Sequence, residues 1–389
     1  MKKNEQPKII RMYNFLNYRY DLRVNMVTQK IECKKKSGEG VFKPINEDDL
    51  MFQLYEVGFT GFEKEFRTLF KSSKIQRFDP FLTYFQSLSL WQEGDPDYID
   101  ILSDFVKTDD QHWWRTMFKK HLVRTVEQAI GGTEFNKQCL TLVGRQNDGK
   151  TRFLDFLVPS ALSEYSKKGF TFGSKEGFFS LAQNFLINLD ELASFEKKEL
   201  NNEFKAVLSE SLIRYTPKIA NYETSVLRRA SFFASTNQME FLTDETGNVR
   251  WVPFVIKSII HDYGGSKGYS KNVNIDDVWS QAYTLYKMDY KSQLSPEETE
   301  IQEVRNKKFI RITDEMDVIC RFFQKADKND LDAEFMQPTE VMEFLRFKTS
   351  VKLYSNQIGK ALNSLGFTKV SHYKPETGSV KGYFVKKVL

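Results

Sequence analysis

The chain has 389 residues, of which 57 are Lys or Arg and 52 are Asp or Glu, so its formal net charge is +5. Apolar residues make up 40% and charged residues 28%, a balance that excludes collagen-like, low-complexity and wholly disordered chains. The length predicts two or three domains. No apolar stretch is long enough to cross a membrane and the first residues have no apolar signal core, so we expect a cytoplasmic protein with no membrane span.

Cysteines and histidines are few and scattered. The three cysteines form no CxxC pair, and the four histidines do not cluster. We therefore expect neither a disulfide framework nor a zinc site nor histidine-based catalysis.

Charge is distributed unevenly along the chain. Residues 1–45 carry +7 and residues 338–389 carry +6, which leaves −8 for the residues between them. Basic ends on an acidic middle suggest that the ends contact a polyanion such as DNA. Solvated tails are the alternative that charge alone leaves open.

The first third of the chain mixes strand and helix signals. An aromatic and β-branched run at 9–33 predicts strands, whereas helical patterns cover 47–70, 78–91, 98–106 and 111–130. We expect an α+β N-terminal domain over 1–77, of unknown function, and a helical region over 78–136.

From residue 137 short apolar runs alternate with helical patterns. Strands are predicted at 139–144, 185–191, 230–237 and 251–256, and helices at 150–165 and 195–212. This alternation is typical of a mostly parallel sheet covered by helices, so the predicted fold class is α/β. Residues 137–262 are expected to form one domain, and residues 263–310 a helical connector.

A phosphate-binding motif stands between the first of these strands and the helix after it. Residues 144–151 fit GxxxxGK[ST], in which glycines let backbone N–H groups approach a phosphate at a helix N-terminus. Lys150 is predicted to reach the β- and γ-phosphates of ATP, and Thr151 to coordinate Mg²⁺. Asn147 stands where Gly is common and tolerates left-handed φ well, whereas the Asp148 carboxylate should weaken phosphate binding unless it points outward. The predicted nucleotide-binding residues are Gly144, Asn147, Gly149, Lys150, Thr151 and Arg152.

Polar residues follow the next two strands. Asp190 and Glu191 end the run FLINLDE; Asp190 is predicted to hold Mg²⁺ and Glu191 to polarise the attacking water. An isolated Asp-Glu pair would instead be interpreted as a cap of the following helix. Asn237, at the end of ASFFASTN, is predicted to orient water against the γ-phosphate, although Ser-Thr-Asn is also an ordinary turn.

An arginine precedes the fourth strand. Arg250 could reach a neighbouring subunit's nucleotide as an arginine finger, with a surface salt bridge as the alternative. Arg228 and Arg229 are weaker candidates for the same role.

These elements, in this order and spacing, resemble the superfamily 3 helicase type of P-loop ATPase, and above all the virulence-associated protein E family of phages and mobile islands. The resemblance covers roughly residues 78–256. It implies an AAA+-like core that assembles as a ring, usually hexameric, with ATP between subunits and a hairpin that projects into the central channel. That hairpin would span 213–226, with Lys218, Asn221 and Tyr222 near its tip as DNA contacts; an ordinary surface hairpin is the alternative.

Two positions depart from the family pattern. Asp148 stands where a small neutral residue or Thr is usual, and Asn248-Val249-Arg250 stands where two adjacent arginines are frequent. Arg250 is therefore the sole finger candidate at that motif.

The basic C-terminal segment, residues 311–389, predicts a winged helix, because helices are followed by a basic β-hairpin. Its recognition helix would span 355–365 and its wing 369–386. We expect phosphate contacts from the cations of this segment, although winged helices also bind proteins. The predicted contacts are Lys360, Lys369, Lys374 and Lys381.

Two functions from different classes fit these features. The first is an ATP- and Mg²⁺-dependent DNA motor, a replicative helicase or initiator of a phage or mobile element that acts as a ring on DNA. The alternative is a nucleotide-gated, ring-forming switch or scaffold that binds a protein partner with little unwinding. A DNA-binding regulator without helicase activity is a weaker third possibility.

Overall fold

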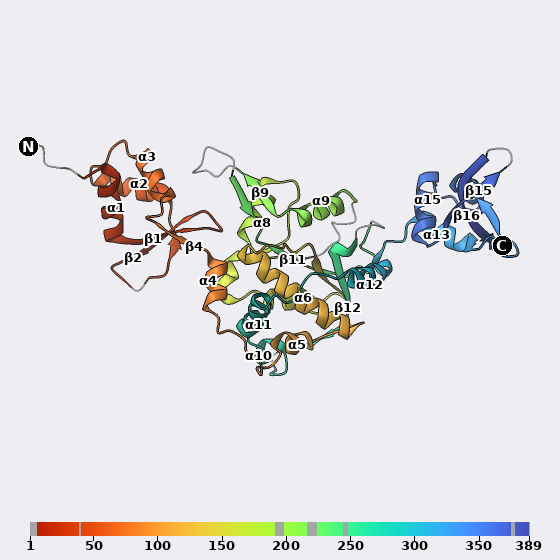
Figure 1. The fold of residues 1–389 in the computed structure, drawn as a ribbon, viewed down its shortest axis with the longest axis horizontal. Coiled ribbons are helices and arrows are strands. Elements are labelled where there is room, and N and C mark those ends of the chain that lie inside the picture. The colour runs from red at the N-terminus through yellow and green to blue at the C-terminus, as the bar shows by residue number, and fades with distance from the viewer. Residues whose placement is uncertain are drawn as a thin grey trace, which may run out of the picture. The chain divides into compact units, whose positions relative to one another are not determined.

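The computed structural model describes residues 6–38, 40–190, 198–215, 224–243, 248–263, 265–374 and 378–388. The chain divides into a larger unit, residues 1–239 and 249–306, and a smaller unit, residues 240–248 and 307–389. Helices and several sheets alternate along the chain (Figure 1), so the predicted mixed α/β class is confirmed. Within the described ranges, every helix is too short or too polar to cross a membrane.

The larger unit begins with a four-stranded sheet in the order β3-β2-β1-β4, covered by three helices. β1 pairs antiparallel with β2 and parallel with β4. Apolar side chains such as Met12, Leu16 and Phe66 fill the core of this part. Its elements are α1 (Lys8–Arg19), β1 (Tyr20–Asn25), β2 (Ile31–Lys35), β3 (Lys43–Pro44), α2 (Glu47–Glu56), α3 (Glu63–Lys71) and β4 (Gln76–Phe78).

Two sequence predictions for this part are wrong. The run at 9–33 opens with helix α1 rather than a strand, because Met12 and Leu16, four residues apart, are buried on one helical face. The helix predicted over 47–70 is two helices. The break contains Gly58 and Gly61, whose φ angles of +85° and +52° leave the helical region.

A six-stranded sheet forms the centre of the larger unit. Its order is β5-β12-β6-β11-β8-β7, and all neighbours pair in parallel except β5, which is antiparallel to β12. The four strands predicted from the alternating pattern are β6, β8, β11 and β12. The strands are β5 (Val106–Thr108), β6 (Cys139–Val143), β7 (Ser166–Lys168), β8 (Leu186–Asp190), β11 (Ser231–Thr236) and β12 (Trp251–Ile259).

Helices cover both faces of this sheet because successive strand residues point to opposite sides. On β11, Phe233 packs against His121 of α6, with ring centroids 4.6 Å apart. The adjacent Phe232 packs against Phe204 of α9 at 5.1 Å. The helices of this part are α4 (Pro80–Ser87), α5 (Tyr98–Ser103), α6 (Gln111–Ile130), α7 (Lys150–Phe156), α8 (Lys175–Gln183), α9 (Lys198–Ser209), α10 (Tyr269–Asn272), α11 (Ile275–Lys287) and α12 (Pro296–Asn306).

Two further predictions need correction. The region 78–136, expected to be helical, also contributes strand β5 to the central sheet. The helix expected over 150–165 ends at Phe156, and a 3-10 helix follows from Ser160 to Tyr165. Pro159 lies between them, and proline has no backbone N–H with which to continue the helix.

A separate two-stranded hairpin lies where the resemblance predicted one. β9 (Leu212–Tyr215) pairs antiparallel with β10 (Thr224–Leu227). Its tip is outside the described residues, and with it Lys218, Asn221 and Tyr222.

The smaller unit is a four-stranded sheet packed against three helices around its own apolar core. β16 pairs antiparallel with β13, β14 and β15. Helix α13 ends at Phe322, and the chain continues directly as strand β13. The elements are α13 (Asp314–Phe322), β13 (Phe323–Lys325), β14 (Glu334–Met336), α14 (Pro338–Arg346), α15 (Ser355–Ser364), β15 (Lys369–Lys374) and β16 (Gly378–Lys387).

Candidate functional site

The loop over 144–151 leaves the carboxyl end of β6, a strand flanked by β12 and β11 in the middle of the sheet. Two of its residues adopt left-handed backbone conformations, Asn147 with φ +68° and Gly149 with φ +78°. Asn147 thus uses the conformational tolerance expected of it. Lys150 then begins α7, so the loop presents the N-terminal end of a helix to the edge of the sheet where the parallel strands end.

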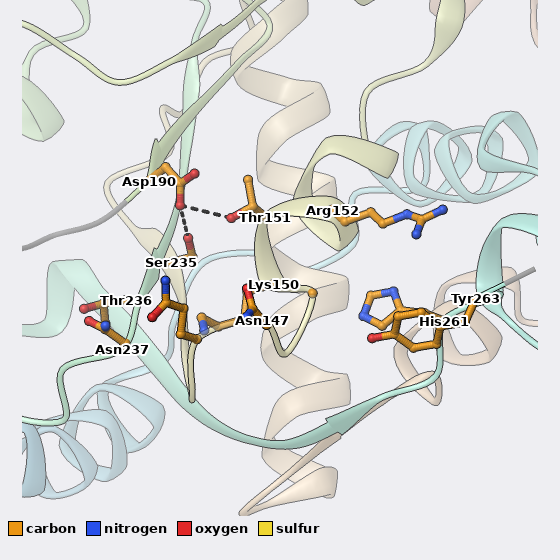
Figure 2. A pocket seen from close by; sticks show the side chains of 12 residues that line it. Asn147, Lys150, Thr151, Arg152, Asp190, Ser235, Thr236, Asn237, His261 and Tyr263 are labelled. Atoms are coloured by element: carbon orange, nitrogen blue, oxygen red, sulfur yellow. Dashed lines mark hydrogen bonds between the residues drawn. The ribbon is translucent and has the colours of Figure 1, made fainter.

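A cavity of about 410 Å³ opens at this edge. Its walls come from the loop, the first turn of α7 and the ends of β8, β11 and β12 (Figure 2). The lining residues are Gln146, Asn147, Gly149, Lys150, Thr151, Arg152, Asp190, Ser235, Thr236, Asn237, His261 and Tyr263.

Lys150 is the cation at the centre of this cavity, although only 8% of its surface is exposed. Its ammonium group donates hydrogen bonds to the backbone carbonyls of Gly144 at 2.9 Å and Arg145 at 2.6 Å. Burial lowers the pKa of Lys150, while the carboxylates of Asp148 and Asp190 oppose that shift. A buried ammonium group held by neutral carbonyls is suited to bind an anion, because an anion would compensate its missing hydration.

Asp190 accepts hydrogen bonds from two hydroxyl groups at the edge of the cavity. Its Oδ1 accepts hydrogen bonds from Thr151 Oγ1 at 3.0 Å and Ser235 Oγ at 2.7 Å, drawn as dashed lines in Figure 2. The register of the sheet explains this contact, because Ser235 of β11 lies directly opposite Asp190 of β8. A carboxylate and two hydroxyls are oxygen donors of the kind that Mg²⁺ prefers. In the described part of the chain no three His, Cys, Asp or Glu side chains cluster as a metal site, so Mg²⁺ bound here would need phosphate oxygens and waters to complete its shell.

The model of the virulence-associated protein E-like domain family matches residues 86–311, more than half of the chain. The chain belongs to this family. The predicted resemblance is thereby confirmed, and the match includes the loop, the cavity and all six strands of the central sheet.

Solved structures support the same fold for this family member. The apo C-terminal region of NrS-1 aligns with a TM-score of 0.54 at 11% identity, covering 98% of this chain and 100% of the other. Another form of that region aligns at 0.51, with 11% identity and coverages of 97% and 99%. An active helicase, SCCmec type IV Cch, aligns at 0.41 with 10% identity over 95% and 93% of the chains, a score from which nothing is carried over. No curated protein matches the sequence.

The remaining predicted catalytic residues of this family member are found in different places. Asn237 lines the cavity next to Thr236, beyond the end of β11 (Figure 2). Arg250 is not part of the described cavity wall; its guanidinium donates to Ser209 Oγ at 3.0 Å. Glu191 lies outside the described residues.

Arg228 and Arg229, the weaker finger candidates, are anchored in the interior. Arg228 is fully buried and donates to Gln128 Oε1 at 3.0 Å and to the carbonyl of Asn136 at 2.6 Å. Arg229 pairs with Asp79 at 2.7 Å. Both side chains therefore hold the residues that follow β10 against the rest of the larger unit, so neither extends to another chain in this conformation.

Asp148 does not line the cavity wall. A Cβ on Gly144 would lie 2.9 Å from Asp148 Oδ2, so this carboxylate is turned toward the base of the loop. The carbonyl of Asp148 lies 3.1 Å from His261 Nε2. The expected conflict between this carboxylate and a phosphate in the cavity is reduced accordingly.

Sequence reasoning missed five residues that line the cavity: Gln146, Ser235, Thr236, His261 and Tyr263. Ser235 is hidden in an apolar strand, and the register with β8 is what reveals it. His261 and Tyr263 follow β12, which runs to Ile259 rather than ending at 256 as predicted. A longer predicted strand would have placed both residues at the same edge as the loop.

The predicted DNA contacts of the smaller unit lie on its surface. Lys360 on α15, Lys369 on β15 and Lys381 on β16 are exposed. Lys369 and Lys381 share one face of the β15–β16 ladder, because Lys381 pairs with Ser371, two residues from Lys369. The side chain of Lys374 is outside the described part.

Proposed function

We propose that this chain is an ATP-hydrolysing DNA motor, of replicative-helicase or initiator type, which acts as a ring. The observation that carries the proposal is the convergence of Lys150, Thr151 and Asp190 on one cavity at the end of a parallel sheet. A glycine-containing loop, a buried lysine and a hydroxyl–carboxylate pair are the groups that phosphoryl transfer from ATP requires. In this proposal the central part of the larger unit is an AAA+-like P-loop core.

Each residue has a role in this chemistry. Lys150 would exchange its two carbonyl acceptors for the oxygens of the β- and γ-phosphates, and the N–H groups of the loop would hold the β-phosphate. Thr151 and Asp190 would hold Mg²⁺, which supplies charge neutralisation on the phosphates when it is bound. Asn237 and Glu191 would orient the attacking water and accept its proton.

Among the described residues that line the cavity of one chain, the sole arginine is Arg152. We therefore propose a ring, in which a second chain completes the site. Arg250 lies outside that wall, where its guanidinium donates to the hydroxyl of Ser209. An arginine finger supplied by an adjacent subunit would stabilise the charge of the transition state. The β9–β10 hairpin, with Lys218, Asn221 and Tyr222, would then face DNA in the channel.

The DNA-binding part of the proposal includes the smaller unit. Three helices, a β15–β16 hairpin and exposed lysines support a winged-helix domain that contacts the phosphate backbone. In this proposal the chain divides into domains at 1–77, 78–136, 137–262, 263–310 and 311–389.

The test is the steady-state ATPase rate with and without single-stranded DNA, for the wild type, Lys150→Ala and the control Lys168→Ala. Lys168 pairs with Asp155 of α7 at 2.7 Å and lies outside the cavity wall. A DNA motor gives a several-fold stimulation that Lys150→Ala abolishes and Lys168→Ala retains. Clear ATP binding with no response to DNA would instead support the nucleotide-gated switch or scaffold.

The ring is tested by mixing inactive variants. Arg250→Ala and Lys150→Ala chains should each be inactive alone, yet a mixture forms some interfaces with an intact Lys150 and an intact Arg250. Partial recovery of ATPase activity in the mixture is expected. A mixture as inactive as its components would contradict a finger acting between subunits.

A further inference from the structure

The cavity has two ends of different chemistry. Figure 2 shows Thr236 and Asn237 on one side of the loop and His261 and Tyr263 on the other, with Lys150 between them. The carboxylate–hydroxyl group around Asp190 lies away from the two rings. A polar end and an aromatic end therefore share one cavity wall.

The aromatic end is built on the helix that follows the loop. Tyr263 packs against His261 with centroids 5.1 Å apart, and His261 packs against Tyr269 at 5.4 Å. Tyr269 in turn contacts Phe153 at 5.3 Å and Phe156 at 4.8 Å, both on α7. The ring of Tyr263 is thus supported by a column of rings that ends on the same helix as Lys150 and Thr151.

His261 fixes the position of this column relative to the loop. It is 7% exposed, and its Nε2 lies 3.1 Å from the carbonyl of Asp148. A Cβ on Gly149 would lie 1.8 Å from the same nitrogen, so the ring packs directly on the glycine of the loop. The Nδ1 atom is buried and has no hydrogen-bond partner within the described structure.

Tyr263 packs against His261 on one side and is otherwise open to solvent. It lines the cavity while 74% of its surface is exposed. Its φ of +39° is uncommon for a bulky residue, and backbone strain of this kind concentrates at ligand-binding positions. A large exposed aromatic ring at one end of a cavity whose other end is polar fits a planar ligand group.

We propose that Tyr263, held by His261, is the stacking platform for the base of the nucleoside triphosphate. This inference rests on the proposed function, because it takes the triphosphate to lie on the 144–151 loop. With the terminal phosphate directed to Asp190 and Asn237, the nucleoside must leave toward the opposite end, where Tyr263 stands. Arg152 extends to that side in Figure 2 and would meet the sugar or the α-phosphate. The base contributes through its π face, as bases do on aromatic side chains in single-stranded nucleic-acid sites.

The experiment compares two ligands on the full chain by titration calorimetry: Mg-ATP, which has a base, and Mg-tripolyphosphate, which has none. Tyr263→Ala should weaken Mg-ATP binding by about tenfold and leave the Kd of Mg-tripolyphosphate unchanged. Tyr263→Phe, which keeps the ring, should restore Mg-ATP affinity. Tyr18→Ala, at a tyrosine that is 83% exposed elsewhere in the larger unit, is the control and should change neither.

Lys150→Ala separates failure of this inference from failure of the proposed function. If Lys150→Ala weakens both ligands but Tyr263→Ala changes neither, or weakens both equally, the base subsite is wrong and the phosphate site stands. If Lys150→Ala leaves the binding of both ligands unchanged, or the wild type binds neither, both proposals are wrong.

Discussion

The two units of this chain place the residues of their candidate sites in opposite ways. In the larger unit, Lys150 and Ser235 are 8% and 2% exposed, and parallel strand ends bring them to one cavity with Asp190. In the smaller unit, Lys360, Lys369 and Lys381 lie on the surface of a helix and a hairpin. The site in the larger unit depends on the register of neighbouring strands. The surface of the smaller unit requires only that its lysines lie on a common face.

The difference predicts different responses to substitution. A buried charge in low-dielectric surroundings interacts strongly with its ligand, and its partners cannot be replaced by water. An exposed lysine contributes modestly and is screened by salt. Single changes in the cavity should therefore have large effects, and single changes in the smaller unit small ones.

The largest effect is expected for Asp190→Asn. Asparagine keeps the size of the side chain but removes the charge that would hold Mg²⁺, so kcat for ATP hydrolysis should fall at least about 100-fold. Asp155→Asn is the matched control, because Asp155 lies on α7 and pairs with Lys168 outside the cavity wall. A wild-type rate for Asp190→Asn, measured in steady state at saturating Mg-ATP, would remove Asp190 from the site.

Gly149→Ala should come next. An alanine here needs φ near +78° and places its Cβ 1.8 Å from His261 Nε2. Gly169→Ala is a control for the backbone alone, since Gly169 has φ +73° and nothing within 4 Å. Both variants should lose about 1 kcal/mol of stability to the strained backbone. Only Gly149→Ala should also weaken Mg-ATP binding, by about tenfold or more, since the loop must move away from His261. Equal Kd values for the two variants would show that His261 does not constrain the loop.

Burial also makes the larger unit sensitive to pH. His121 is fully buried beside Arg124, and burial, with a smaller contribution from the Arg124 charge, holds the pKa of His121 well below its usual value. Below about pH 6.5 the unfolded chain binds a proton at this histidine that the folded unit does not. As the pH is lowered further, this group therefore reduces the free energy of unfolding by about 1.4 kcal/mol per pH unit. Above that pH the contribution is constant.

Tryptophan fluorescence can follow this transition in the full chain, because all five tryptophans belong to the larger unit. Urea unfolding between pH 7 and 5 should show a shallower pH dependence for His121→Leu than for the wild type. His112→Gln, at an exposed histidine of the same helix, should follow the wild type. Identical slopes for His121→Leu and the wild type would mean that His121 is protonated in the folded unit.

A smaller effect is expected for Ser235→Ala. The substitution removes one hydrogen bond to Asp190 Oδ1 and leaves the one from Thr151. We expect the Mg²⁺ concentration at half-maximal ATPase rate to rise by about fivefold, as the loss of one net hydrogen bond suggests. Ser231→Ala, on the same strand, removes a hydrogen bond from Asn136 at 3.2 Å and should leave that concentration unchanged. A similar rise in both variants would reflect general loosening of β11.

Sequence predicted the parts of this site that follow from local pattern. The loop motif and the apolar strands before Lys150 and Asp190 are local, and the structure has them where they were expected. Ser235 depends on which strand lies beside β8, and that information is not local. His261 and Tyr263 depend on where β12 ends, and the mixed polarity of its last residues, Lys257 and Ser258, concealed three further residues of strand.

The N-terminal helix α1 illustrates the same limit. Aromatic and β-branched residues at 9–19 favour strands by propensity, but tertiary packing of Met12 and Leu16 decides for a helix. In this segment the burial of Met12 and Leu16 on one helical face outweighs the strand propensity of the other residues.

The smallest effects of single substitutions are expected in the smaller unit. They test most directly whether its exposed lysines differ from the buried site of the larger unit. Replacing Lys360, Lys369 or Lys381 by alanine should weaken DNA binding only by about two- to threefold at physiological salt, because each is exposed and screened. The slope of log Kd against log salt concentration should nevertheless fall by about 0.9 for each phosphate of duplex DNA that a variant no longer neutralises. Lys387→Ala is the control, since Lys387 is already paired with Glu334 at 2.6 Å. A variant in which all three lysines are replaced by alanine completes the test. If it keeps the wild-type slope, these lysines bind no phosphates, and the exposed face of the smaller unit is better explained as a surface that binds protein.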